Sequence, residues 1–146
     1  MATDPVELIV EDEPEPKHVQ AITDGLVAYN SAQVDPHRPE PLAVFLRVRG
    51  QILAGAEGHT HWRWLHVNRL WVHDTLRRHG SGRLVLTTME EAARRRGCQA
   101  AWLDTFSFQA VGFYQRLGYR VFGELTDYPP GHTRHFLWKP LDKKLP

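Results

Sequence analysis

The chain has 146 residues, with 18 Lys and Arg residues against 17 Asp and Glu residues and a formal net charge of +1 at pH 7. This length suits one compact core, so we expect a single domain over residues 1–146. The near-neutral charge gives no general electrostatic affinity for nucleic acid. Because no run reads as a secretory signal or a bilayer span, we expect a cytoplasmic protein that does not bind membranes.

The first half of the chain predicts, in order, a strand, a helix, a proline-rich loop and three further strands. The helix is indicated by apolar residues at three- and four-residue intervals behind Pro14 and Pro16. A hairpin is indicated by two apolar runs on either side of Gly50. These elements are expected at residues 6–10, 17–29, 31–41, 42–48, 52–57 and 61–73.

The second half predicts two helices and three strands, expected at residues 81–96, 100–104, 110–117, 119–125 and 132–137. The apolar positions of the first helix are Leu84, Val85, Met89, Ala92 and Ala93. The single cysteine, Cys98, precedes an apolar strand, which favours a buried structural thiol over a nucleophile. Alternation of strands and helices predicts an α/β domain with a mixed sheet.

The most informative segment is Arg77-Arg78-His79-Gly80-Ser81-Gly82, between an expected strand and an expected helix. Its glycines let the backbone approach an anion closely. The helix that follows adds N–H groups that have no partner inside the helix. The segment therefore predicts a pyrophosphate-binding loop, although an ordinary solvated loop can have the same composition.

Two motifs carry a family resemblance. The first is Val72, four residues, and then Arg77-x-x-Gly80-x-Gly82. The second is Ala-Val-Gly-Phe-Tyr-Gln-Arg-Leu-Gly-Tyr at residues 110–119. In this order they resemble the two signatures of the GNAT superfamily of acetyl-CoA-dependent N-acetyltransferases. The resemblance implies an α/β GNAT fold with a mixed central sheet of about six to seven strands and about four flanking helices. It also implies a V-shaped splay between the fourth and fifth strands, here residues 61–73 and 100–104.

The resemblance implies acetyl-CoA as the cofactor, held by the strand end, the loop and the second motif. Ser107 stands where relatives often carry an asparagine that contacts the pantetheine arm, and a hydroxyl can still bond one amide. Leu70 and Val72 are equally well explained as core residues that offer only backbone groups. The implied cofactor-binding residues are Leu70, Trp71, Val72, Arg77, Arg78, His79, Gly80, Ser81, Gly82, Arg83, Ser107 and Tyr114.

The catalytic roles also come from the resemblance. Tyr114 is expected to protonate the departing thiolate, and a purely structural core tyrosine is the alternative. His66 aligns with the base of histone-acetylating relatives, and an imidazole with an ordinary pKa near 6.5 suits that role. Glu57 is the alternative base, and ordered water without a dedicated side chain is the third possibility.

Together these residues predict direct transfer of the acetyl group from acetyl-CoA to a primary amine on a small molecule, without a covalent acyl-enzyme. A protein or peptide amine is the alternative acceptor, and a non-catalytic acyl-CoA-binding module is the alternative class. No metal site is expected, because the pairs His59-x-His61 and His132-x-x-His135 lack the spacing of a zinc site. The resemblance further implies a homodimer.

An acceptor cation has several candidate partners. Arg69 stands where relatives often have an acidic residue, so another carboxylate or an aromatic ring must serve. The candidates are Glu57, Asp104, Glu124 and Asp127, and the aromatic residues Tyr29, Trp62, Trp64 and Phe108.

Overall fold

The computed structural model describes residues 4–142 and divides into an N-terminal unit that ends at His37 and a second unit that begins at Arg38. The N-terminal unit contains helix α1, Pro16–Ser31, which confirms the helix expected at residues 17–29. Pro16 occupies the first turn of α1, where a backbone N–H is not needed for the helix. The expected strand at residues 6–10 is wrong, because nothing in residues 4–142 pairs with that segment.

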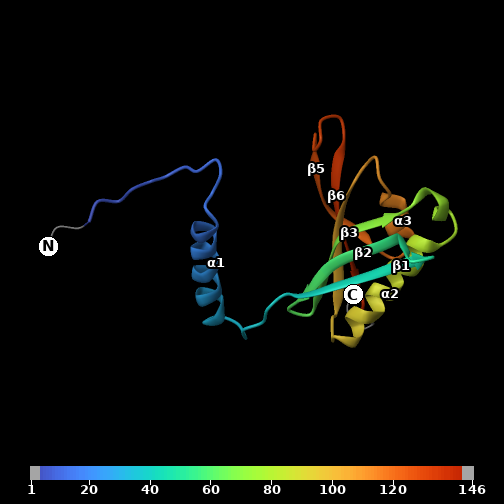
Figure 1. The fold of residues 1–146 in the computed structure, drawn as a ribbon, viewed down its shortest axis with the longest axis horizontal. Helices are drawn as coiled ribbons and strands as arrows, with labels where there is room; N and C mark the ends of the chain where they lie inside the picture. Colours follow the sequence, from blue (N-terminus) through green and yellow to red (C-terminus); the bar gives the residue numbers. More distant parts are fainter. Residues whose placement is uncertain (1–3, 143–146) are drawn as a thin grey trace. The chain divides into compact units, whose positions relative to one another are not determined.

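The second unit is built on one six-stranded sheet in the order β1-β2-β3-β4-β6-β5, drawn in Figure 1. All neighbouring pairs are antiparallel except β3 and β4, which confirms the predicted mixed sheet. The strands are β1 (Glu40–Val48), β2 (Gln51–His61), β3 (Trp64–Val72), β4 (Ala100–Phe106), β5 (Arg120–Thr126) and β6 (Thr133–Pro140).

Three α-helices occur in residues 4–142, where about four were expected. The other two are α2 (Ser81–Arg95) and α3 (Val111–Arg116), and a single 3-10 turn, η1 (Asp74–Leu76), follows β3. The long strand expected at residues 61–73 is corrected by a hairpin, because β2 continues to His61 and β3 begins only at Trp64. Trp62 and Arg63 form its turn with φ of 46° and 64°. Neither residue type signals such a turn, since glycine or asparagine normally takes that conformation.

Helix α2 packs against β1, β2 and β3 and covers the hydrophobic core on one face of the sheet. Its buried apolar residues are Val85, Leu86, Met89 and Ala93. Leu84 was expected on this face but is 58% exposed, whereas Leu86 is fully buried. The apolar stripe therefore follows residues 85, 89 and 93, spaced four apart, with residue 86, three before 89, beside them on the same side of the helix. Cys98 is buried at the edge of the same core, as expected.

The two parallel strands pair over only part of their length. Trp64–Val67 pairs with Ala100–Leu103, and beyond this point the strands separate, which places the splay between β3 and β4. On the other side of β3 the register with β2 skips one residue, so Asn68 is an extra, bulged residue. A Cβ on Gly58 would overlap the carbonyl oxygen of His66 beside this bulge. Glycine at position 58 therefore allows β3 to bend where it leaves β4.

A buried polar cluster ties α2 to the far end of the sheet. Glu90 on α2 is 1% exposed and accepts hydrogen bonds from the Tyr119 hydroxyl at 2.7 Å and from Lys139 Nζ at 2.9 Å. Tyr119 follows α3, and Lys139 lies on β6. The cluster therefore links the helix that follows β3 to the elements that follow β4.

Candidate active site

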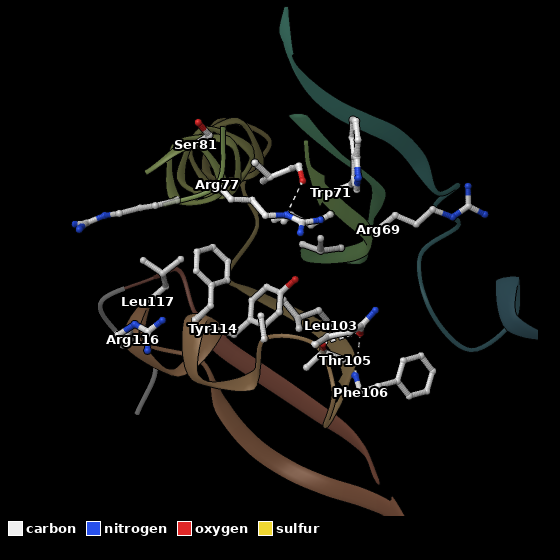
Figure 2. Close-up of a pocket in the computed structure, with 18 of the residues that line it drawn as sticks. Arg69, Trp71, Arg77, Ser81, Leu103, Thr105, Phe106, Tyr114, Arg116 and Leu117 are labelled. Carbon is white, nitrogen blue, oxygen red and sulfur yellow. Dashed lines mark hydrogen bonds between the residues drawn. The ribbon is translucent and has the colours of Figure 1, made fainter. Parts of the chain in front are cut away.

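A cavity of about 1110 Å³ opens where β3 and β4 separate. It is bordered by the end of β3, the turn before α2, the end of β4, and α3. Figure 2 shows the Tyr114 side chain between Arg77 and Ser81 on one side and Thr105 and Phe106 on the other. Ten of the twelve predicted cofactor-binding residues line this cavity: Leu70, Trp71, Val72, Arg77, Arg78, Gly80, Ser81, Gly82, Arg83 and Tyr114.

The turn before α2 lines the cavity and, within residues 4–142, has backbone amides without a backbone partner. The N–H groups of residues 78–83 donate to no other backbone group in the part of the chain that the structure describes. The next N–H, that of Leu84, donates to the Gly80 carbonyl at 2.9 Å. Arg77 is held in place, because its Nε donates to the Val72 carbonyl at 3.1 Å and its Nη1 lies 2.7 Å from Asp74 Oδ1. Unpartnered amides at the positive end of a helix form an anion site.

The two glycines of the turn serve different purposes. Gly80 has φ of 77°, a left-handed conformation that glycine adopts without a steric penalty, and a Cβ there would meet nothing within 4 Å. At Gly82 a Cβ would lie 3.3 Å from Cζ of Phe113 and 3.5 Å from Cγ2 of Val72. Gly82 therefore lets the first turn of α2 pack closely against β3 and α3.

Tyr114 on α3 is 8% exposed, and in residues 4–142 its hydroxyl makes no hydrogen bond. The rings of Phe113 and Tyr119 pack edge-on against it, with centroids 5.0 Å and 6.0 Å away. Burial, and secondly the nearby Asp104 carboxylate, raise the pKa of Tyr114 to about 12. The phenol is therefore protonated at neutral pH, and its hydroxyl is available to a molecule bound in the cavity.

Asp104 is the one carboxylate among the cavity-lining residues of the described chain. Arg134 on β6 holds it, because Nε donates to Oδ2 at 2.7 Å and Nη2 lies 2.7 Å from the same oxygen. The Arg134 guanidinium also lies 5.1 to 5.6 Å from the ring centroids of Phe106, Tyr128 and Phe136. Both contacts with Arg134 use Oδ2, so Oδ1 can accept a hydrogen bond from a ligand.

Comparison with known proteins decides the family. Residues 5–119 match the model of the Acetyltransferase (GNAT) family. The chain belongs to this family. It is 46% identical over 94 residues to the blasticidin-S acetyltransferase of Streptomyces morookaense, a match that covers 64% of this chain and 69% of that protein. It is 35% identical over 121 residues to an acetyltransferase of Agrobacterium fabrum, covering 82% and 88%.

A solved structure confirms the GNAT fold. An acetyltransferase from Bacillus cereus superposes on this chain with a TM-score of 0.83 and 30% identity, covering 90% of this chain and 97% of that one. This GNAT protein is accordingly an acyltransferase. None of the helices in residues 4–142 combines the length and apolar character that crossing a bilayer requires.

Two of the predicted cofactor contacts of this GNAT protein do not line the cavity. His79 lies in the turn but is exposed outside the cavity lining. The Oγ of Ser107 accepts a hydrogen bond from the Thr133 N–H at 3.0 Å and lies 3.4 Å from Nδ1 of His132. That hydroxyl is therefore engaged in joining β4 to β6.

The two predicted bases, His66 and Glu57, are also not among the residues that line the cavity. His66 stacks on Trp102 with centroids 3.9 Å apart, and burial, then neighbouring His59, lower its pKa. Its Nε2 is buried without a hydrogen-bond partner among the described residues. Glu57 accepts a hydrogen bond from Asn68 Nδ2 at 2.7 Å and lies 3.6 Å from Nε of Arg69. Since Asn68 and Arg69 do line the cavity, Glu57 is one side chain removed from it.

The sequence analysis missed two residues that shape the site of this GNAT enzyme. Gly58 accommodates the bulge of β3, and a glycine inside an apolar strand run was the available signal. Gln109 lines the cavity, and its Oε1 accepts hydrogen bonds from the Phe106 N–H at 3.0 Å and the Thr105 hydroxyl at 2.9 Å. Gln109 fixes the end of β4 through these two hydrogen bonds, which no sequence pattern predicts.

Of the candidate cation partners in the second unit, Asp104 and Phe108 line the cavity and the others do not. In residues 4–142, the one group of three potential metal ligands within 4.8 Å is Glu11, Glu15 and His18, which are exposed in the N-terminal unit. Neither histidine pair considered from the sequence gains a third ligand in the described chain.

Proposed function

We propose that this GNAT protein transfers the acetyl group of acetyl-CoA directly to a primary amine of a small molecule. One observation carries the proposal: the amide-lined turn and the protonated Tyr114 hydroxyl border the same cavity. The similarity to a protein named blasticidin-S acetyltransferase supports a small-molecule acceptor.

The residues present fit acetyl-CoA, which when bound supplies an activated acetyl thioester. The amides of residues 78–83 suit its diphosphate, and the side chains of Arg78 and Arg83 add positive charge at the same end of the cavity. Beyond Val67 and Leu103 the facing edges of β3 and β4 are not bonded to each other. Apart from the Val72 carbonyl, which accepts from Arg77, and the Phe106 N–H, which donates to Gln109, the backbone groups on these edges are available to the amide-containing arm of the cofactor.

The acceptor amine is assigned to the end of the cavity that holds Asp104. Five arginines line the cavity, and the carboxylate of Asp104 is its one negative partner within the described residues. Oδ1 of Asp104 can bind the ammonium form and keep the nitrogen near Tyr114. Since neither His66 nor Glu57 lines the cavity, we assign removal of the amine proton to water.

Tyr114 is assigned the role of hydrogen-bond and proton donor to the departing sulfur. The gap between its pKa of about 12 and an ordinary thiol pKa of about 8.5 corresponds to about 5 kcal/mol. Protonation of a fully formed thiolate by Tyr114 would therefore be uphill. The phenol instead stabilises charge as it develops on sulfur, and proton transfer accompanies that development.

The proposal is tested by following thiol release from acetyl-CoA with blasticidin S as the first amine, followed by a panel of small primary amines. We expect release that requires both acetyl-CoA and amine, with no acetyl group on the protein when acetyl-CoA is incubated alone. An acetylated protein that passes the group to amine would overturn direct transfer. Acetyl-CoA binding with turnover only on peptides would replace the acceptor class, and binding without any turnover would indicate a non-catalytic module.

A further inference from the structure

Three aromatic rings form a nearly parallel stack at the end of β4. Phe106 and Phe108 have centroids 5.4 Å apart and planes that differ by 3°. Phe106 and Tyr128 have centroids 6.2 Å apart and planes that differ by 10°. Phe106 is the last residue of β4, Phe108 follows it in the connection to α3, and Tyr128 lies between β5 and β6. The alignment thus joins segments that are distant in the sequence.

The stack is fixed by groups on the protein itself. The Arg134 guanidinium lies 5.6 Å from the centroid of Phe106 and 5.1 Å from that of Tyr128, while its pairing with Asp104 holds the guanidinium. The Phe106 N–H is bonded to Gln109 Oε1. The rings are therefore oriented by contacts that do not depend on a ligand.

Phe108 is the outer member of this stack and borders the cavity. Its side chain is 55% exposed, although His132 contacts its ring at a centroid distance of 4.9 Å and an angle of 77°. Phe106 and Phe108 line the same cavity as Asp104 and Tyr114. An oriented, largely exposed ring beside the carboxylate assigned to the amine has the chemistry of a stacking surface.

We propose that the acceptor carries its amine on a planar aromatic or heteroaromatic group and that Phe108 is the surface on which this group stacks. This inference rests on the proposed function and narrows its substrate class. A flat ring continues the parallel series of Tyr128, Phe106 and Phe108, whereas a puckered ring of equal size cannot make the same face-to-face contact. Phe108 is then a specificity-determining residue that acts on the acceptor and not on acetyl-CoA.

The test compares benzylamine with cyclohexylmethylamine, which share a carbon skeleton and differ in whether the ring is flat. Thiol release from acetyl-CoA gives kcat/KM for each amine, corrected for the fraction of neutral amine at the pH used. We expect the wild type to favour benzylamine by about fivefold. Phe108→Leu should bring this preference to within about twofold of unity while the KM for acetyl-CoA stays unchanged.

The matched control is Phe122→Leu, which alters a ring of similar exposure, 59%, on β5 outside the cavity lining. It should keep the wild-type preference. Three outcomes would overturn the stacking surface and leave the proposed function intact. The wild type could use both amines equally, it could turn over saturated amines alone, or Phe108→Leu could lower kcat/KM equally for both amines. Binding of acetyl-CoA without thiol release for any amine would instead overturn the proposed function, and this inference with it.

Discussion

The two sides of the splay offer a ligand different kinds of groups. On the side of β3 and α2, the lining residues include a turn whose backbone amides have no backbone partner in the described chain, together with exposed guanidinium groups. On the side of β4 and α3, the lining residues offer particular side chains, Tyr114, Asp104 and Phe108, and Arg134 on β6 holds Asp104. Under the proposed function, the first side would bind the diphosphate through backbone groups, and the second would act on the thioester and the acceptor through side chains.

This difference explains why the two sides should respond differently to substitution. A backbone site tolerates many side chains but fails when its path is blocked, because the amides themselves cannot be removed. A side-chain site fails when one functional group is removed, even though the space is preserved. Substitutions on the two sides therefore distinguish these two kinds of sensitivity.

The largest expected effect is on the backbone side. Gly82→Trp should weaken acetyl-CoA binding at least about 100-fold, because the new side chain must occupy the cavity or displace Phe113 and Val72. Isothermal titration calorimetry measures this loss. The control is Leu84→Trp, an exposed position on the same helix that does not line the cavity, and its affinity should match the wild type. If Gly82→Trp is unfolded by circular dichroism, Gly82→Leu takes its place, and unchanged binding by a folded variant with either bulky side chain would refute the pyrophosphate-binding loop.

On the side-chain side, Tyr114→Phe should lower kcat by about 100-fold while leaving the Kd for acetyl-CoA nearly unchanged. The pKa of about 12 means that the phenol stays protonated up to pH 10, so the wild-type kcat should show no alkaline decline between pH 7 and 10. In that range kcat/KM should instead rise as the amine loses its proton. An alkaline decline that disappears in Tyr114→Phe would contradict the raised pKa.

The buried polar cluster of Glu90, Tyr119 and Lys139, which links the two sides, should affect the stability of the fold more than the rate of catalysis. Glu90→Gln should lower the free energy of unfolding by about 2 kcal/mol, because the partly buried Lys139 ammonium loses its charged partner, the buried Glu90 carboxylate. Urea denaturation measures this change. Glu91→Gln is the control, since Glu91 is exposed and paired only with Arg94, three residues further along α2. A loss no larger than that of the control would mean that the cluster does not hold the two sides together.

A comparable loss of stability is expected at the bulge. Gly58→Ala should destabilise the protein by about 1–3 kcal/mol, since the added methyl group overlaps the His66 carbonyl and must push β2 and β3 apart. Gly123→Ala is the control, because a Cβ there meets nothing within 4 Å. Thermal denaturation of the two variants compares them directly, and equal melting temperatures would show that the bulge can relax freely.

The smallest effect is expected for the two side chains considered as bases. His66→Gln and Glu57→Gln should each change kcat by less than about tenfold and leave the pH dependence of kcat/KM in place, because neither side chain lines the cavity. Steady-state kinetics from pH 6 to 9 tests both variants. Loss of the pH-dependent limb in either one would make that residue the base and end the assignment to water.

Some features of the fold and of the site could be predicted from the sequence, and others could not. The turn at residues 77–82 and the position of Tyr114 were predictable because each depends on neighbouring residues in one short segment. The hairpin at Trp62 and Arg63 was not predictable, since their left-handed conformations are unusual for these residue types. The exposed Leu84 was misplaced because residues 84, 85 and 86 are all apolar, and contact with the sheet selects which of them is buried.

The sequence by itself determined the family motifs, the glycine-containing turn before α2 and the position of Tyr114, because local spacing and glycine conformations suffice to specify them. Only the tertiary structure decided where β3 leaves β4, which carboxylate borders the cavity, and which ring extends the stack of Phe106. These features depend on pairings such as Asp104 with Arg134, thirty residues apart, and on the overlap avoided at Gly58. Such contacts exist only once the strands have taken their register.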